Sequence, residues 1–138
     1  SKVYGLAGVR IGYLVARPDI AARLIRNRVA YTNVLALHAA EAAMKDQAFY
    51  DFSIQKNATA KQMIYKTLDE LGLEYQPSHT NFVFFKSGRP IAELNQQMLE
   101  KGVMIGRPFP PLTDWCRIST GTLEEVQRFN EALKQVLS

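Results

Sequence analysis

A lysine and an arginine near the start of the chain have the types and spacing that suit a cofactor carrying an aldehyde and a phosphate. Lys2 is followed eight positions later by Arg10, with Gly5 and Gly8 between them. A deprotonated lysine amine condenses with an aldehyde, and an arginine fork binds a phosphate through two parallel hydrogen bonds. The spacing alone is equally consistent with a surface arginine at a strand edge and with a mobile terminal lysine.

The elements that must position these residues follow from hydrophobic periodicity and capping signals. Residues 1–12 are glycine-rich and predict a loop, and the apolar run 11–16 predicts a buried strand. Pro18 favours the start of a helix with an apolar stripe, and Asn33 is a suitable N-cap for an alanine-rich helix that ends near Asp46. Residues 47–71 contain neither glycine nor proline and predict one long helix.

After residue 72 the pattern changes to short strands alternating with helices. We expect a strand at 81–86, a helix from Pro90 to Gly102, a short strand at 103–105, a loop at 106–114, a strand at 115–120, and a last helix that Thr122 and Glu125 open as a capping box. This order predicts a small α/β sandwich. The first 44 residues hold one strand and two helices, too little for a core, so we expect them to belong to a larger sheet.

Composition excludes several classes of protein. The 138 residues are 47% hydrophobic and 22% charged, which is ordinary for a globular domain and excludes a disordered tail or a coiled-coil rod. No apolar run approaches the roughly 20 residues of a membrane span. One cysteine excludes an intramolecular disulfide framework, and one cysteine with two histidines does not favour a structural zinc site, so we expect no metal. No secretory signal follows the start, which indicates a cytoplasmic protein, and the missing initiator methionine indicates a piece of a longer one.

Positive charge is concentrated in the first part of the chain. The net charge is +4, and residues 1–30 hold six basic side chains against Asp19 alone. Such a block is compatible with nucleic acid, with an anionic small molecule, or with a solvated helix face. We do not expect nucleic acid, because Phe82, Phe84 and Phe85 lack the interleaved basic residues of an RNA-binding sheet.

The segment around Lys2 is more specific than its spacing. Residues 1–13 read SKVYGLAGVRIGY. This resembles the active-site segment Ser-Lys-x-x-Gly-Leu-Ala-Gly-x-Arg-x-Gly-Tyr of fold-type I pyridoxal phosphate enzymes, in the histidinol-phosphate branch of the class I and II aminotransferases. Ser1 matches the residue before the lysine. The resemblance implies that Lys2 is the Schiff-base lysine and Arg10 a ligand of the cofactor phosphate, with pyridoxal 5'-phosphate as the cofactor.

Three further segments match the same family and imply substrate contacts. Residues 117–122 read RISTGT, and the family pattern Arg-Ile-x-x-Gly-Thr makes Arg117 the clamp of a substrate α-carboxylate. Residues 102–108 read GVMIGRP, which is similar to Gly-Val-x-Val-Arg-Pro and implies that Arg107 holds a distal phosphate. Residues 78–82 read SHTNF, which leaves Asn81 either beside Arg117 or capping a turn. The following Phe109-Pro110-Pro111 is not the usual continuation in this family.

The resemblance also implies the organisation of the protein. The fold class is α/β, with the end of a pyridoxal-phosphate-transferase large domain at 1–46, a connecting helix at 47–72, and a small C-terminal α/β domain at 73–138. We expect a homodimer that transaminates an amino acid or amino-phosphate with a 2-oxo acid. The chain corresponds to the last two-fifths of a family member, so we expect it to need the N-terminal part and to be inactive alone.

Alternatives and minor candidates remain open at this point. The same scaffold supports pyridoxal-phosphate-dependent decarboxylases and lyases, and a non-catalytic anion-binding α/β module is the alternative from another class. His38, on an apolar helix, is expected to be a packed core histidine, and Cys116 a core thiol. His79 is expected to have a structural role in a turn.

Overall fold

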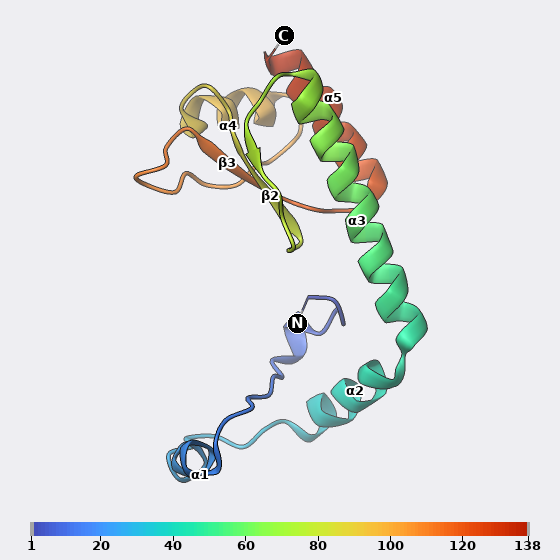
Figure 1. Cartoon of the computed structure of the whole chain (residues 1–138), viewed down its shortest axis with the longest axis vertical. Helices are drawn as coiled ribbons and strands as arrows, with labels where there is room; N and C mark the ends of the chain where they lie inside the picture. Colours follow the sequence, from blue (N-terminus) through green and yellow to red (C-terminus); the bar gives the residue numbers. More distant parts are fainter. Residues whose placement is uncertain (1, 138) are drawn as a thin grey trace. The chain divides into compact units, whose positions relative to one another are not determined.

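The computed structural model describes residues 2–137, and their contacts divide the chain into two compact units, Ser1–Ser53 and Ile54–Ser138. The division falls within the long helix α3 (Gln47–Glu70), which is the helix predicted from residues 47–71 (Figure 1). Ser1, which matches the family segment, lies outside the described residues. None of the helices in residues 2–137 has the length and apolar character needed to cross a membrane.

The first unit consists of a short turn and helices joined by extended segments. Its elements are η1 (Ala7–Val9), α1 (Pro18–Arg26), α2 (Val34–Lys45) and the beginning of α3. The predicted N-cap of α2 is confirmed, because Asn33 Oδ1 accepts hydrogen bonds from Leu35 N at 2.9 Å and Ala36 N at 3.4 Å. These bonds satisfy two amides that the first turn of a helix otherwise leaves unpaired.

The strand predicted at 11–16 is wrong for the residues that the structure describes. The segment belongs to no strand, and Tyr13 and Val15 are 85% and 87% exposed. A strand requires hydrogen bonds to a neighbouring strand, and the described residues of the first unit provide none. The apolar stripe of α1 is open for the same reason, with Leu24 51% exposed. An apolar sequence pattern makes burial of a segment favourable, but burial also requires another part of the protein to cover that segment.

The second unit is a three-stranded antiparallel sheet with helices. The strands β1 (Tyr75–Gln76), β2 (Phe82–Lys86) and β3 (Trp115–Ser119) lie in the order β1-β2-β3. The predicted strands at 81–86 and 115–120 are confirmed. The two-residue strand β1 was not predicted, and the strand predicted at 103–105 is wrong, because residues 103–105 pair with no described strand.

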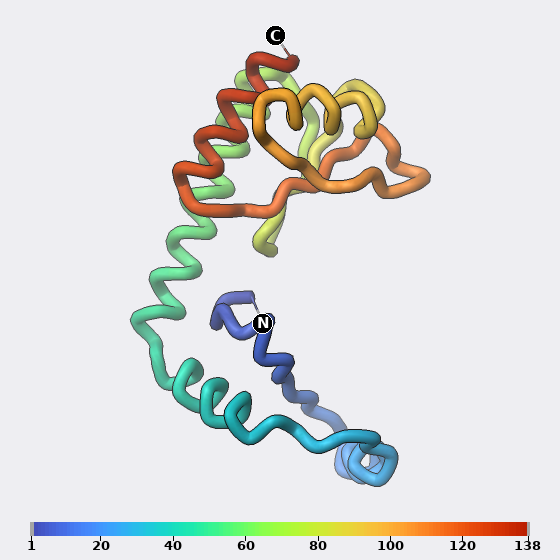
Figure 2. Tube along the Cα trace, turned by 180° about the vertical axis from the view of Figure 1, so that it is seen from behind, coloured from blue at the N-terminus to red at the C-terminus, as the bar shows by residue number. Residues whose placement is uncertain are grey.

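Three helices cover one face of this sheet. They are the end of α3, α4 (Ile91–Glu100) and α5 (Leu123–Leu137), and α5 runs beside α3 in both views (Figures 1 and 2). The capping box of α5 is confirmed, since Thr122 N donates to Glu125 Oε2 at 2.8 Å and Glu125 N donates to Thr122 Oγ1 at 3.2 Å. The fully buried core side chains include Val83, Phe85 and Cys116 from the sheet and Ile64, Leu68, Ile91, Leu94, Met98 and Leu133 from the helices.

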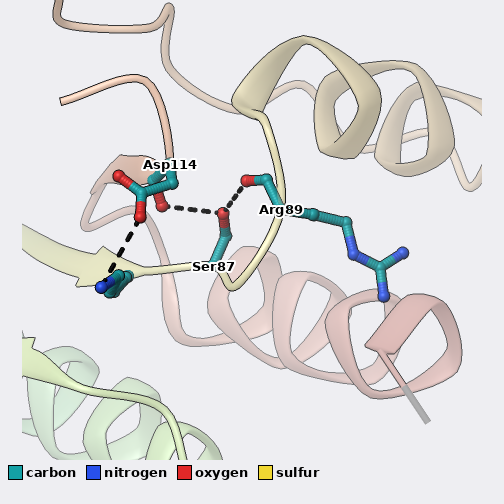
Figure 3. Close-up of polar contacts among 4 residues, drawn as sticks. Ser87, Arg89 and Asp114 are labelled. Carbon is teal, nitrogen blue, oxygen red and sulfur yellow. Dashed lines mark hydrogen bonds and ion pairs between the residues drawn. The ribbon is translucent and has the colours of Figure 1, made fainter. Parts of the chain in front are cut away.

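A buried serine fixes the base of the loop that precedes β3 (Figure 3). Ser87 is only 3% exposed, and its hydroxyl oxygen lies within donor distance of two carbonyl oxygens, 2.6 Å from Arg89 O and 2.9 Å from Asp114 O. Ser87 N also donates to Asp114 O at 2.8 Å, and Lys86 Nζ lies 3.7 Å from Asp114 Oδ2. The end of the loop is therefore held against the end of β2.

Candidate active site

The Lys2 segment forms a tight turn. Gly5 N donates to Lys2 O at 3.0 Å, and Gly5 takes φ +64°, a left-handed conformation that a side chain disfavours. The next residue but one begins η1. Tyr4, between the lysine and the glycine, packs its ring 5.7 Å from that of Tyr50 on α3. Lys2 is exposed at the start of this turn.

Arg10 closes the same segment in an unusual conformation. It is a non-glycine residue with φ +56°, and its guanidinium donates back to Ala7 O at 2.9 Å. A left-handed non-glycine residue costs of order 1–3 kcal/mol, and such residues concentrate at ligand sites. The side chain is exposed. The segment thus presents an amine and a guanidinium on a short, strongly turned stretch of backbone, which is a donor set suited to an aldehyde and a phosphate.

Arg117 lies on the face of the small sheet that the helices do not cover. It stands opposite Phe84 in the antiparallel pair of β2 and β3, while its neighbour Cys116 stands opposite the buried Phe85. Side chains alternate between the two faces of a strand, so burial of Cys116 and Phe85 directs Arg117 and Phe84 to the open face. The outward position of Arg117 follows directly from this alternation.

The open face holds an apolar groove with Arg117 at its edge. The groove has a volume of about 630 Å³, and its apolar lining comes from Pro77, Phe82, Phe84, Phe109 and Leu112. The guanidinium of Arg117 lies over two of these rings, 5.3 Å from the centroid of Phe82 and 5.0 Å from that of Phe109. Among residues 2–137 it makes no ion pair. Its donors are therefore available to an anion.

Arg107 lies close to Arg117 because the loop after α4 passes directly against β3. A methyl group added at Gly106 would collide with the carbonyl oxygen of Arg117, so only glycine permits this approach. Asn95 Nδ2 on α4 donates to Gly106 O at 3.1 Å. Arg107 is exposed, and its Cζ lies 4.6 Å from the ring centroid of Phe109. The two arginines proposed to hold substrate thus share one aromatic ring.

Asn81 contributes its backbone to the end of the sheet. Its carbonyl oxygen accepts hydrogen bonds from Thr120 N at 2.9 Å and Thr120 Oγ1 at 3.0 Å. No hydrogen bond joins Asn81 to Arg117 among the residues of the second unit that the structure describes. The structure therefore brings together Arg107 and Arg117, and it assigns Asn81 contacts at the start of β2.

The remaining sequence candidates are Cys116, His38 and His79. Cys116 is fully buried, as predicted, and burial raises the pKa of its thiol to about 12. His38 was expected in a core but is exposed, because the described residues of the first unit do not cover that side of α2. His79 lies in a turn that Ser78 and Thr80 close through a 2.8 Å hydroxyl contact, and it also lines the groove.

The aromatic lining of the groove was not predicted from the sequence. Phe82 and Phe84 alternate with the buried Val83 and Phe85, so the two-residue period of the strand carries the signal for an apolar open face. Phe109 has no such signal, because it lies in a proline-containing loop without periodicity. Its place beside both arginines depends on how that loop folds back.

Comparison with protein families shows which family the chain belongs to. The family model described as "Aminotransferase class I and II" matches residues 1–133, which include the Lys2 segment, Arg107 and Arg117. The chain belongs to the class I and II aminotransferase family. It is 41% identical over 140 residues to the histidinol-phosphate aminotransferase of Symbiobacterium thermophilum, with 99% of this chain and 38% of that protein covered.

Solved structures agree with the sequence comparison. A putative histidinol-phosphate aminotransferase from Erwinia carotovora atroseptica matches with a TM-score of 0.93 and 39% identity over 98% of this chain and 39% of that one. The histidinol-phosphate aminotransferase from Sinorhizobium meliloti, solved with pyridoxal-5'-phosphate, matches with a TM-score of 0.83 and 32% identity, covering 99% of this chain and 39% of that one. The predicted α/β fold class is confirmed.

The coverage of these matches shows how much of a relative's length the chain spans. It spans 38% of the length of the Symbiobacterium relative, so it corresponds to part of such a protein. The decarboxylase or lyase alternative and the non-catalytic anion-binding module are not favoured by these comparisons.

Proposed function

We propose that these 138 residues are part of a pyridoxal-phosphate-dependent aminotransferase that acts on an amino acid or an amino-phosphate, with a 2-oxo acid as the acceptor. Membership of the family supports the reaction class, and the names of the relatives support a histidinol-phosphate-like donor. The observation that carries the proposal is the guanidinium of Arg117, without an ion pair among the described residues, at the edge of an apolar groove. The lining suits a side chain, and the guanidinium suits a carboxylate.

The residues of the first unit fit the proposed cofactor. Lys2 supplies an amine that can bind an aldehyde carbon, and Arg10 supplies a fork for a phosphate, on a segment that turns at Gly5 and ends in a left-handed residue. When bound, pyridoxal phosphate supplies a conjugated ring that draws electrons away from the bonds of the substrate α-carbon. The structure of the histidinol-phosphate aminotransferase from Sinorhizobium meliloti was determined with pyridoxal-5'-phosphate, which supports the same cofactor for this chain.

Lys2 is proposed as the catalytic residue. Its Nζ, once unprotonated, would take the proton from the substrate α-carbon and pass it to the carbon that was the cofactor's aldehyde, and it would move a proton in the opposite direction in the half-reaction with the 2-oxo acid. An amine does this only in its neutral form. Arg10 is proposed to hold the phosphate and thereby to orient the aldehyde toward Lys2.

Arg117 and Arg107 are proposed to bind the substrate. Arg117 holds the α-carboxylate through two parallel hydrogen bonds, which fix the direction of the α-carbon as well as its distance. Arg107 holds a second anionic group such as a distal phosphate. Asn81 is proposed as a substrate-side residue from its place in the family motif, although its described contacts support the end of the sheet.

The wider organisation is part of the same proposal. The end of a large domain at 1–46, a connecting helix at 47–72 and a small domain at 73–138 are carried over from the family resemblance. The family resemblance also supplies the expectation of a cytoplasmic homodimer and of a required N-terminal part. The exposed Tyr13, Val15 and Leu24 of the first unit support that need, because apolar side chains of this number are normally covered.

Borohydride reduction of the full-length protein tests this function. A Schiff base on Lys2 would be reduced to a stable pyridoxyl adduct, which intact mass and peptide mapping would assign to that residue. Lys2→Arg, which keeps the charge, would abolish the adduct and lower kcat by at least about a thousandfold. A full-length protein that is supplied with pyridoxal phosphate, turns over an amino donor and carries no adduct at Lys2 would contradict the assignment.

A further inference from the structure

Two guanidinium groups lie over the ring of Phe109. Arg107 Cζ is 4.6 Å and Arg117 Cζ is 5.0 Å from its centroid. The two cations are therefore no farther apart than the sum of these two distances. Phe109 belongs to the Phe-Pro-Pro run at which this sequence departs from the family pattern. The ring thus occupies a place in the groove that the family motifs did not predict.

The ring gives each of the two like charges a contact that can offset their repulsion. Arginines repel at short range, and the negative face of an aromatic ring attracts each of them. Neither arginine makes an ion pair within residues 2–137. Apart from the ring, the structure gives Arg107 a 3.5 Å contact with the carbonyl oxygen of its own neighbour, Pro108. Without Phe109, the backbone at Gly106 would still bring Arg107 close to Arg117, but the Arg107 guanidinium would have little to direct it.

Phe109 is itself held in place on several sides. Its ring meets Phe84 of β2 edge to face, with centroids 6.2 Å apart and planes at 89°. Leu112 N donates to Phe109 O at 2.8 Å, which closes the tip of the loop. The end of the loop is tied to the buried Ser87 through Asp114 O. The ring therefore presents its face to the two cations from a fixed backbone.

We propose that Phe109 is a positioning residue that sets the spacing of the Arg107 and Arg117 guanidiniums, so that one substrate with two anionic groups is held by both. This rests on the proposed function, which gives Arg117 and Arg107 their ligands. A substrate with a single carboxylate would use Arg117 and gain little from the ring. The second anionic group can be a carboxylate or a phosphate, because both accept the same hydrogen bonds from arginine.

The test compares ligands with one and two anionic groups on the full-length holoenzyme. Glutarate, 4-phosphonobutyrate and butyrate share a carboxylate and the three carbons attached to it, and only the first two carry a second anionic group. Calorimetry measures their binding without turnover. The variants are Phe109→Leu, which removes the ring, Phe109→Trp, which keeps one, and Trp115→Leu, a matched control that removes a ring from β3. The ring centroid of Trp115 lies 5.0 Å from that of Phe84, but Trp115 does not line the groove and the structure gives it no guanidinium contact.

We expect the wild-type protein to bind a two-anion ligand at least about tenfold more tightly than butyrate. Phe109→Leu should lower that ratio by roughly fivefold to tenfold, whereas Phe109→Trp and Trp115→Leu should keep it within about twofold. KM for a two-anion amino donor should rise in Phe109→Leu with kcat nearly unchanged, as for lost uniform binding. Glutarate and 4-phosphonobutyrate then show which second group the pair prefers.

The proposal is overturned if the wild-type protein shows no preference for two anionic groups, if folded Phe109→Leu keeps the full preference, or if Trp115→Leu loses it equally. Phe109→Met takes the place of the leucine variant if the latter does not fold. Failure of the proposed function is recognised separately, by the absence of the Lys2 adduct. A protein with the preference but without the adduct would retain the positioning role of Phe109 and lose the aminotransferase assignment.

Discussion

The hydroxyl of Thr120 lies 2.8 Å from Asn57 Oδ1, which joins the end of β3 to a residue 63 positions earlier on α3. Asn57 Nδ2 donates in turn to Thr80 O at 3.2 Å, just before β2. One amide therefore connects the helix to the ends of both strands that line the groove. Because Thr120 N also donates to Asn81 O at 2.9 Å, the two strand ends and the helix form one connected unit.

Replacing Asn57 should loosen this connection. Asn57→Ala removes both hydrogen bonds and should lower the free energy of unfolding by about 1–2 kcal/mol. Asn57→Asp keeps an acceptor for Thr120 and removes the donor to Thr80, so its loss should be intermediate. Urea unfolding measures both, with the exposed neighbour Gln55→Ala as a control expected within about 0.5 kcal/mol of the wild type. Equal stability of Asn57→Ala and wild type would show that the amide does not connect these elements.

Arg117 should be the residue on which carboxylate binding depends most. Arg117→Gln removes the charge and the fork, and it should raise KM for the amino donor by roughly a hundredfold, since each charge-assisted hydrogen bond contributes about 1.5–3 kcal/mol. Arg117→Lys restores the charge without the planar fork and should recover part of the loss. Steady-state kinetics of the full-length protein provide the measurement. Arg89→Gln, which changes an arginine bonded to Gln97 on α4, is the control and should leave KM unchanged.

Removing the hydroxyl of Ser87 should destabilise the loop that carries Phe109. Ser87→Ala leaves Arg89 O without this donor, while Asp114 O keeps its bond from Ser87 N at 2.8 Å. We therefore expect a loss of about 1–2 kcal/mol rather than a complete collapse of the loop base. Thermal or urea unfolding measures the change, and Ser119→Ala, at an exposed strand position, should cost less than about 0.5 kcal/mol. A larger loss at Ser119 than at Ser87 would contradict this order.

Cys116 should remain a protonated, unreactive thiol in the folded protein. Burial raises its pKa from 9.0 to about 12. Between about pH 9 and 12 the folded state keeps this proton and the unfolded state releases it. The contribution of the protonated thiol to the free energy of unfolding is therefore complete below about pH 9. It is lost as the pH rises toward 12, by up to about 1.4 kcal/mol per pH unit.

Alkylation at pH 8 followed by peptide mapping checks this directly. Iodoacetamide should modify Cys116 of the folded protein at least about tenfold more slowly than in urea, because the thiolate is the nucleophile. Cys116→Ala should also flatten the fall in stability between about pH 9 and 11 relative to wild type. Rapid modification under native conditions would show that the thiol is accessible.

Local chemistry in the sequence determined most elements of the fold. Asn33 and the pair Thr122 and Glu125 fixed helix starts, because a cap acts through hydrogen bonds within three or four residues. The alternation from Phe82 to Phe85 and around Cys116 determined which strand residues enter the core. The Lys2 segment and the Arg117 motif were visible for a similar reason, since each is a contiguous pattern.

Tertiary structure decided what depends on partners distant in the chain. The apolar runs 11–16 and 103–105 suited strands, but a strand forms only where a second backbone supplies hydrogen bonds, and neither run has one among the described residues. The groove, and the place of Phe109 beside Arg107 and Arg117, arise because the loop after Gly106 folds back against β3. Non-local contacts of this kind leave no period in the sequence, so only the folded chain reveals them.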